Sequence, residues 1–174
     1  MKWLWEHSYK VAFFAYNLAR NFRKKKDLLD DAYVGGILHD MGKIIFSNVH
    51  PDLLEKINRF CERRGIEGNI FEDLSAGLNH AEIGGRIAEK WNFPSPLIES
   101  IRFHHEPVIC SPGNKEVVFT VYLANALVHI ADGELDYDHL NNEVLQDYGI
   151  RDEQQVRLIV ERLQSAFEHE GFRH

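Results

Sequence analysis

The sequence predicts an all-α protein, built as a single bundle of six or more helices. Its long segments repeat apolar residues at the i, i+3, i+4, i+7 spacing of a helix with one buried face. Glycine and proline stop signals separate these segments, notably at Gly65, Pro107 and Pro112. Strand signals are weak, because the one β-branched cluster, at residues 117–121, merges into a helical period.

The first two helices follow from their apolar stripes. Counting back four residues from Val11 reaches His7, so His7 belongs to the inward face of the first helix. A second helix is expected from about Leu28 to Asp40, with Gly42 as a C-terminal stop. The residues expected to face inward are Val11, Phe14, Ala15, Leu18, Ala19 and Phe22 in the first helix and Leu29, Tyr33, Gly36 and Ile37 in the second.

Two further helices are expected in the middle of the chain. Pro51 fits the first turn of a third helix that ends near Gly65. A long fourth helix is expected from about Phe71 to Trp91, and Gly84 and Gly85 within it predict a close approach of a neighbouring backbone. Its inward stripe is expected to contain His80, Ile83, Gly84, Ile87 and Trp91.

Three helices are expected in the rest of the chain. A short fifth helix opens at Pro94 and Pro96 and runs into His104 and His105, and residues 108–115 form a surface loop. A sixth helix spans about Glu116 to Asp132, with Val118, Val121, Asn125, Val128 and Asp132 on one face. A C-terminal amphipathic helix spans about Asp152 to Phe167.

Composition excludes several classes of protein. The chain has 174 residues and a net charge of −7, so the sequence indicates no broad positively charged face that would bind duplex nucleic acid. No apolar stretch approaches the roughly 18 residues that a membrane span requires, and two cysteines give no disulfide framework. We therefore expect a soluble, cytoplasmic protein without membrane or duplex nucleic-acid partners.

The placement of the ten histidines indicates which chemistry the protein could perform. A buried neutral imidazole must hydrogen-bond or bind a metal, and a carboxylate among imidazoles needs compensating positive charge. Asp40 is such a carboxylate, and imidazole with carboxylate suits Fe, Mn, Zn, Co or Ni. Five histidines lie at the inward ends of apolar stripes: His7, His39, His80, His104 and His105. The pattern predicts a metal site at the centre of the bundle.

Each histidine taken alone has a plainer interpretation. A single inward histidine is more often a hydrogen-bonded core residue than a ligand, and only the joint pattern favours metal. The remaining five histidines lack comparable local partners, and we interpret them as surface or capping residues: His50, His129, His139, His169 and His174.

The segment Ile37-Leu38-His39-Asp40-Met41-Gly42-Lys43 resembles the signature of the HD-domain phosphohydrolase superfamily. His7-Ser8, His80 and His104-His105 resemble the rest of its ordered series of ligands. Residues 79–84, 91–94 and 123–127 look most like HDOD domains. Glu106-Pro107-Val108 stands where the cyclic-di-GMP phosphodiesterases have Gly-Tyr-Pro, which disfavours that reaction. The resemblance covers about residues 3–132, and we expect one domain over 1–174 with a helical extension at about 133–174.

The resemblance implies a ligand set and two catalytic residues. Asp40 would ligate and bridge, and Lys43 would pair with a phosphate oxygen, although a solvent-facing lysine is an equal alternative. Asn125 stands at the last ligand position, where the superfamily has Asp, and Asp132 is the alternative two turns later. One or two divalent ions would be held by His7, His39, Asp40, His80, His104, His105 and Asn125.

Two functions follow from the resemblance. The first is a metal-dependent phosphohydrolase acting on a small phosphoester, such as a nucleotide. The alternative is a non-catalytic HDOD-type signalling or regulatory domain that keeps the fold and the metal and binds protein partners. The complete histidine set favours hydrolysis, whereas Asn125 and the missing Gly-Tyr-Pro element favour regulation.

Overall fold

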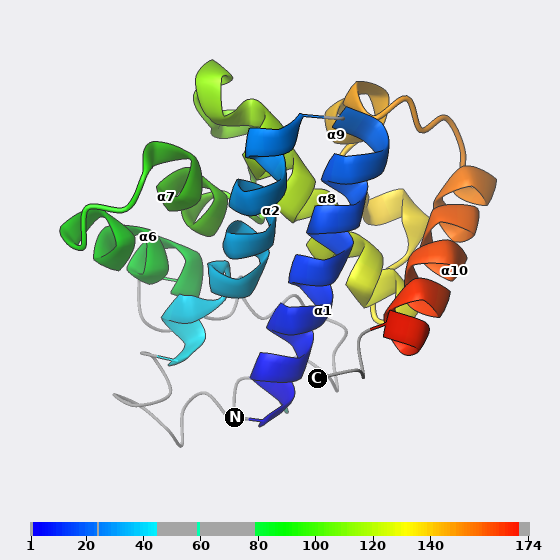
Figure 1. Ribbon diagram of the computed structural model, residues 1–174, viewed down its shortest axis with the longest axis horizontal. Coiled ribbons are helices and arrows are strands. Elements are labelled where there is room, and N and C mark those ends of the chain that lie inside the picture. Colours follow the sequence, from blue (N-terminus) through cyan, green and yellow to red (C-terminus); the bar gives the residue numbers. More distant parts are fainter. Residues whose placement is uncertain (1, 24, 45–58, 60–78, 171–174) are drawn as a thin grey trace.

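The computed structural model describes residues 2–23, 25–44, 59 and 79–170. Within these residues every regular element is helical, which confirms the predicted all-α class. Figure 1 shows α1 and α2 side by side, with α6 and α7 on one flank and α10 on the other. The elements are α1 (Lys2–Leu18), a π-helical turn η1 (Ala19–Arg23), α2 (Lys26–Leu38), α6 (His80–Lys90), α7 (Ser95–Arg102), η2 (Pro107–Ile109), η3 (Pro112–Asn114), α8 (Lys115–Ala131), η4 (Tyr137–His139), α9 (Asn142–Asp147) and α10 (Glu153–Glu170).

Helix α8 is the central element of the core. It packs against α1, α2, α7 and α10, and its residues from Val117 to Val128 are buried apart from Tyr122. A helix that is apolar on nearly all sides can be stable only when other helices surround it. Phe14 and Leu18 of α1 pack into the same core as Phe119 and Leu123 of α8. Each such side chain contributes roughly 1.5–3 kcal/mol of burial free energy.

The inward face of α2 differs from the predicted one. Leu28, Ala32, Gly35 and Gly36 are buried, whereas Tyr33 is exposed. Small residues face inward because α2 lies directly on the backbone of α1: a Cβ atom at Gly36 would lie 2.6 Å from the Cα of Ala12. The predicted face was right for Gly36 and wrong for Tyr33.

Helix α6 begins nine residues later than predicted, at His80. Asn79 has an extended backbone, and its side chain accepts a hydrogen bond from the Glu82 N–H, as an N-cap residue does. A continuous helix through Asn79 is therefore wrong. Trp91, predicted inward, is 60% exposed because it lies at the C-cap of α6. The expected third helix and residues 71–78 lie outside the described residues.

The expectation of a close backbone contact at the glycines of α6 is confirmed. A Cβ atom at Gly84 would lie 2.8 Å from Ile101 Cγ2 and 3.3 Å from the Gly42 nitrogen. Helix α7 ends at Arg102, so His104 and His105 follow the helix and do not continue it as predicted. Two short 3₁₀ turns, η2 and η3, occupy much of the expected surface loop at 108–115.

The C-terminal part contains a helix that the sequence analysis missed, α9. The Asn141 side chain caps it by accepting from the Glu143 and Val144 N–H groups. Helices α8 and α10 match their predicted ranges to within three residues. In the part of the chain that the structure describes, no helix combines the length and apolarity that crossing a membrane requires.

Candidate metal centre

Side chains from four segments converge in the interior. Helix α1 supplies His7, the end of α2 supplies His39 and Asp40, and α6 begins with His80. The turn after α7 supplies the remaining pair, His104 and His105. The structure thus brings together all five histidines that the sequence placed on inward faces.

Gly42 allows the end of α2 to approach the start of α6. A Cβ atom at this position would overlap the carbonyl oxygen of His80, so only glycine fits. The close approach places the Asp40 carboxylate beside the His80 ring, with Oδ1 3.2 Å from Nε2. Gly42 was predicted to end the second helix, and that prediction is wrong, because α2 ends at Leu38 and residues 41–44 are helical again.

Three imidazoles form one group, which we call the triad site: His80, His104 and His105. The Nε2 atom of His80 lies 3.2 Å from that of His104 and 3.1 Å from that of His105. Nitrogen ligands about 2.0–2.1 Å from one ion lie about 3 Å apart, so the spacing fits a metal ion. Asp40 Oδ1 faces this group as well, 3.7 Å from His104 Nε2.

The second group, which we call the carboxylate site, contains His7, His39 and Asp40. Asp40 Oδ2 lies 3.5 Å from His39 Nε2 and 3.9 Å from His7 Nε2. The two oxygens of Asp40 thus face different groups, Oδ1 the triad site and Oδ2 the carboxylate site. One carboxylate between two groups of imidazoles is an arrangement that suits two neighbouring cations.

The hydrogen bonds of His39 and His104 show that the donor set fits a metal. Nδ1 of His39 donates to the Gly36 carbonyl at 2.8 Å, and Nδ1 of His104 donates to the Ile101 carbonyl at 2.7 Å. Each neutral ring therefore presents an unprotonated Nε2 to the interior. His39 Nε2 is buried and has no hydrogen-bond partner. A cation would satisfy this lone pair.

Electrostatics keep these groups in the protonation states that metal binding requires. Burial, followed by the neighbouring His39, lowers the pKa of His7 from 6.5 to about 3. Burial also lowers the pKa of His39 and holds the pKa values of His104 and His105 well below 6.5. Burial alone would raise the pKa of Asp40, but Lys43 and His39 outweigh it and hold that pKa well below its ordinary value. Neutral imidazoles and an ionised carboxylate result.

The three remaining predicted site residues lie at different distances from the centre. Lys43 points toward the site, and its Nζ donates to Asp40 Oδ2 at 2.9 Å. Asn125 is 7% exposed, and its Oδ1 lies 3.0 Å from His7 Nε2. The side chain of Asp132 is 42% exposed and pairs with Lys10 at 2.7 Å. Of the two alternatives, the structure brings Asn125 to the carboxylate site.

One histidine beside the centre was misjudged from the sequence. The ring of His129 lies 5.0 Å from that of His7, and its Nδ1 lies 2.7 Å from Glu134 Oε2. His129 is one helical turn beyond Asn125 on α8, a spacing that could have revealed it. His139 and His169 are exposed, as predicted, and His50 and His174 lie outside the described residues.

A cleft of about 540 Å³ opens beside the carboxylate site. His7 and Lys43 line it and also contact Asp40, so two neighbours of the carboxylate border the cleft. The other lining residues are Trp3, Glu6, Tyr9, Lys10, His129, Asp132, Glu134 and Phe167.

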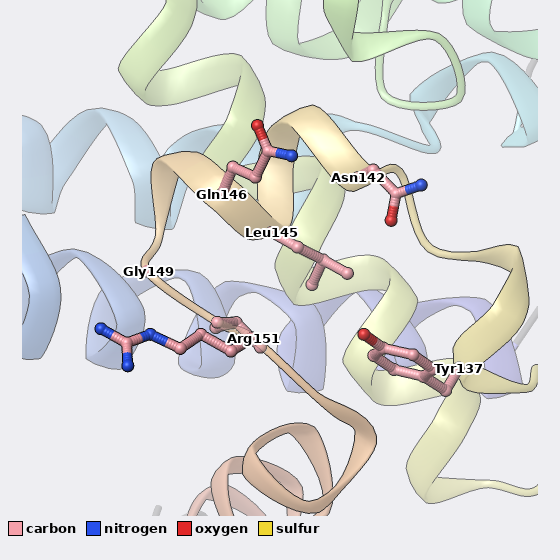
Figure 2. Close-up of a pocket in the computed structure, with 7 residues that line it drawn as sticks. Tyr137, Asn142, Leu145, Gln146, Gly149 and Arg151 are labelled. Carbon is pink, nitrogen blue, oxygen red and sulfur yellow. The ribbon is translucent and has the colours of Figure 1, made fainter.

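A second hollow, of about 390 Å³, lies around α9 (Figure 2). Its lining includes Tyr137, Asn142, Gln146 and Arg151 but no imidazole or carboxylate. Figure 2 shows the Arg151 side chain extending away from the Tyr137 ring. The hollow therefore offers no set of metal ligands.

Comparison with known proteins places this arrangement in context. The family model of the HDOD domain matches residues 1–107. An uncharacterized protein of Treponema pallidum is 34% identical over 169 residues, which are 97% of this chain and 33% of that protein. The chain thus spans about a third of that relative's length.

Two solved structures share the fold at low identity. A candidate signal-transduction protein from Marinobacter aquaeolei superposes with a TM-score of 0.77 at 23% identity, covering 97% of this chain and 38% of that one. A candidate phosphohydrolase from Shewanella amazonensis gives a TM-score of 0.67 at 21% identity, covering 92% of this chain and 58% of that one.

Proposed function

This chain belongs to the HDOD domain family, and from that premise we propose that it is a divalent-metal-dependent phosphohydrolase acting on a small phosphoester such as a nucleotide. The observation that supports the proposal most is the Asp40 carboxylate between two groups of neutral imidazoles. The triad site and the carboxylate site would each hold one divalent transition-metal ion, from Fe, Mn, Co, Ni or Zn.

The chemistry proposed is hydrolysis of a phosphoester bond. A water oxygen bonds to phosphorus while the bond from phosphorus to the ester oxygen breaks, and the departing alcohol oxygen takes up a proton from the water. Metal ions bound at the two sites would supply Lewis-acid activation of the water and of the phosphoryl group. Inorganic phosphate and a free alcohol are the products when the substrate is a monoester.

The protein's own residues would orient the reactants. Asn125 holds the His7 ring through its 3.0 Å contact, and the backbone carbonyls of Gly36 and Ile101 hold His39 and His104. Lys43 lines the cleft and pairs with Asp40, and we expect its ammonium to contact a phosphate oxygen that enters beside the carboxylate.

A second function is favoured by one observation, the neutral amide of Asn125 at the carboxylate site. With Asp in that place the site would carry one more negative charge, and a site with less charge holds a cation less tightly. A regulatory HDOD domain would tolerate this weaker cation binding, because it needs no turnover and could hold one stable ion or none.

The experiment that separates the two functions begins with the metal. Elemental analysis of protein purified without chelator would be followed by a screen of phosphoesters with added Mn, Fe, Co or Ni. We expect bound metal and release of inorganic phosphate, both abolished in Asp40→Asn. Bound metal without turnover of any phosphoester would contradict the hydrolase and favour the regulatory domain.

A further inference from the structure

The cleft beside His7 shows what kind of phosphoester would fit the site, an inference that rests on the proposed function. A phosphate that contacts Lys43 beside Asp40 would leave the rest of its molecule in this cleft, because both His7 and Lys43 line it. The remaining lining residues then contact the alcohol part of the ester.

The charges of the cleft oppose additional phosphates. Lys10 is paired with Asp132 at 2.7 Å, and Lys43 with Asp40 at 2.9 Å, so both lysines that line the cleft already have a carboxylate partner. Glu134 adds another carboxylate at the cleft, hydrogen-bonded to His129. Every phosphate beyond the first would bring further negative charge into the cleft, where the carboxylates of Asp132 and Glu134 would repel it.

Aromatic side chains form the apolar part of the same cleft. Trp3 lines it and is 50% exposed, so part of its surface is open to a ligand. Phe167 of α10 lines it too, and its ring lies 5.7 Å from Tyr9 and 5.3 Å from Phe13, which fix its position. Aromatic rings of ligands stack on such surfaces.

We propose that the cleft selects a phosphomonoester whose alcohol part carries an aromatic ring, and that it discriminates against polyphosphate esters. Trp3 provides the stacking surface, and Asp132 and Glu134 provide the discrimination. Their carboxylates also accept hydrogen bonds from amino or hydroxyl groups of the alcohol part.

Calorimetric titration of the Mn²⁺-loaded protein tests the proposal, with AMP, ribose 5-phosphate and ADP as probes at one fixed free Mn²⁺ concentration. We expect AMP to bind roughly ten-fold more tightly than ribose 5-phosphate, as the loss of one stacked base implies. ADP should bind more weakly than AMP. Equal affinities for AMP and ADP, or no AMP binding, would overturn the proposal.

Variants assign these preferences to residues. Trp3→Ala should remove the preference for AMP over ribose 5-phosphate, and Trp3→Phe should retain it. Glu134→Gln and Asp132→Asn should each raise the affinity for ADP relative to AMP. Trp91→Ala, an exposed tryptophan outside the cleft lining, is the control. An unchanged preference in Trp3→Ala would overturn the stacking role.

Turnover is measured separately, so that failure of the proposed hydrolase activity can be distinguished from failure of the proposed ligand class. Binding with the expected preference and no release of phosphate from AMP would leave the ligand class standing and contradict the hydrolase. Release of phosphate from ADP at least as fast as from AMP would support a hydrolase and overturn the ligand class.

Discussion

Nε2 of His7 lies 3.0 Å from Oδ1 of Asn125, so a neutral amide faces the imidazole of the carboxylate site. Asn125 is buried on α8, where the surrounding residues hold its backbone in place. Because Asp has nearly the same shape as Asn, a substitution by Asp changes the charge at this position with little change of shape.

Asn125→Asp should tighten metal binding at the carboxylate site and raise any phosphohydrolase activity, because it adds an anionic oxygen beside His7. We expect an increase of roughly ten-fold or more in affinity, measured by metal titration. Asp132→Asn is the control for metal affinity alone, since Asp132 pairs with Lys10 at the surface and lines the cleft. Loss of metal in that control, with no gain in Asn125→Asp, would identify Asp132 as the ligand.

His39→Ala and Asp40→Ala should abolish stoichiometric metal and leave a folded protein. Removal of a group that only supports a metal ligand costs roughly 10–100-fold in affinity, so removal of a ligand should cost at least that. Elemental analysis and circular dichroism check this expectation, with the exposed His169→Ala as control. If both variants kept their metal, the proposed site would be wrong.

Gly42→Ala should disrupt the centre without removing a ligand. The added methyl group would overlap the His80 carbonyl, a backbone atom that cannot rotate away, so α2 and α6 must separate. We expect a loss of roughly 1–3 kcal/mol in unfolding free energy together with weaker metal binding. Gly113→Ala, where a Cβ atom meets nothing within 4 Å, should change neither.

Metal-free protein should lose stability as the pH falls below 6.5. The pKa of His7 is about 3 in the folded protein and 6.5 in the unfolded chain, so between these values the unfolded state binds the extra proton. The buried histidines with lowered pKa act in the same direction. Each contributes a slope of up to about 1.4 kcal/mol per pH unit.

Urea unfolding of chelator-treated protein between pH 7 and pH 4 measures this slope. His7→Gln should reduce it, and the exposed His169→Gln should not. A stability that stays constant or rises over this range would show that the buried histidines are protonated in the folded state.

Periodicity predicted the elements well where a helix has a large apolar side chain on its buried face. It placed His7 inward from Val11, and α8 and α10 close to their observed bounds. On α2 it predicted the buried Gly36 correctly but wrongly placed Tyr33 inward, which is 37% exposed. It failed on Asn79 because the same residue type can lie in a helix or cap one.

The site was predictable in composition but not in geometry. The apolar stripes identified the five histidines and the resemblance to HD proteins added Asn125, whereas their pairing depends on contacts between segments far apart in the chain. His129 was missed because its partner Glu134 lies past the end of α8, in a turn that periodicity does not describe.

The bonds from His39 to the Gly36 carbonyl and from His104 to the Ile101 carbonyl have a consequence for metal loading. Both rings already expose a lone pair at neutral pH, so binding a cation there expels no proton. The heat of metal binding should then be the same in buffers of different ionisation enthalpy, and loading should be insensitive to moderate acidification of the surroundings. A metal-binding protein with thiol ligands, which must lose protons, would behave in the opposite way.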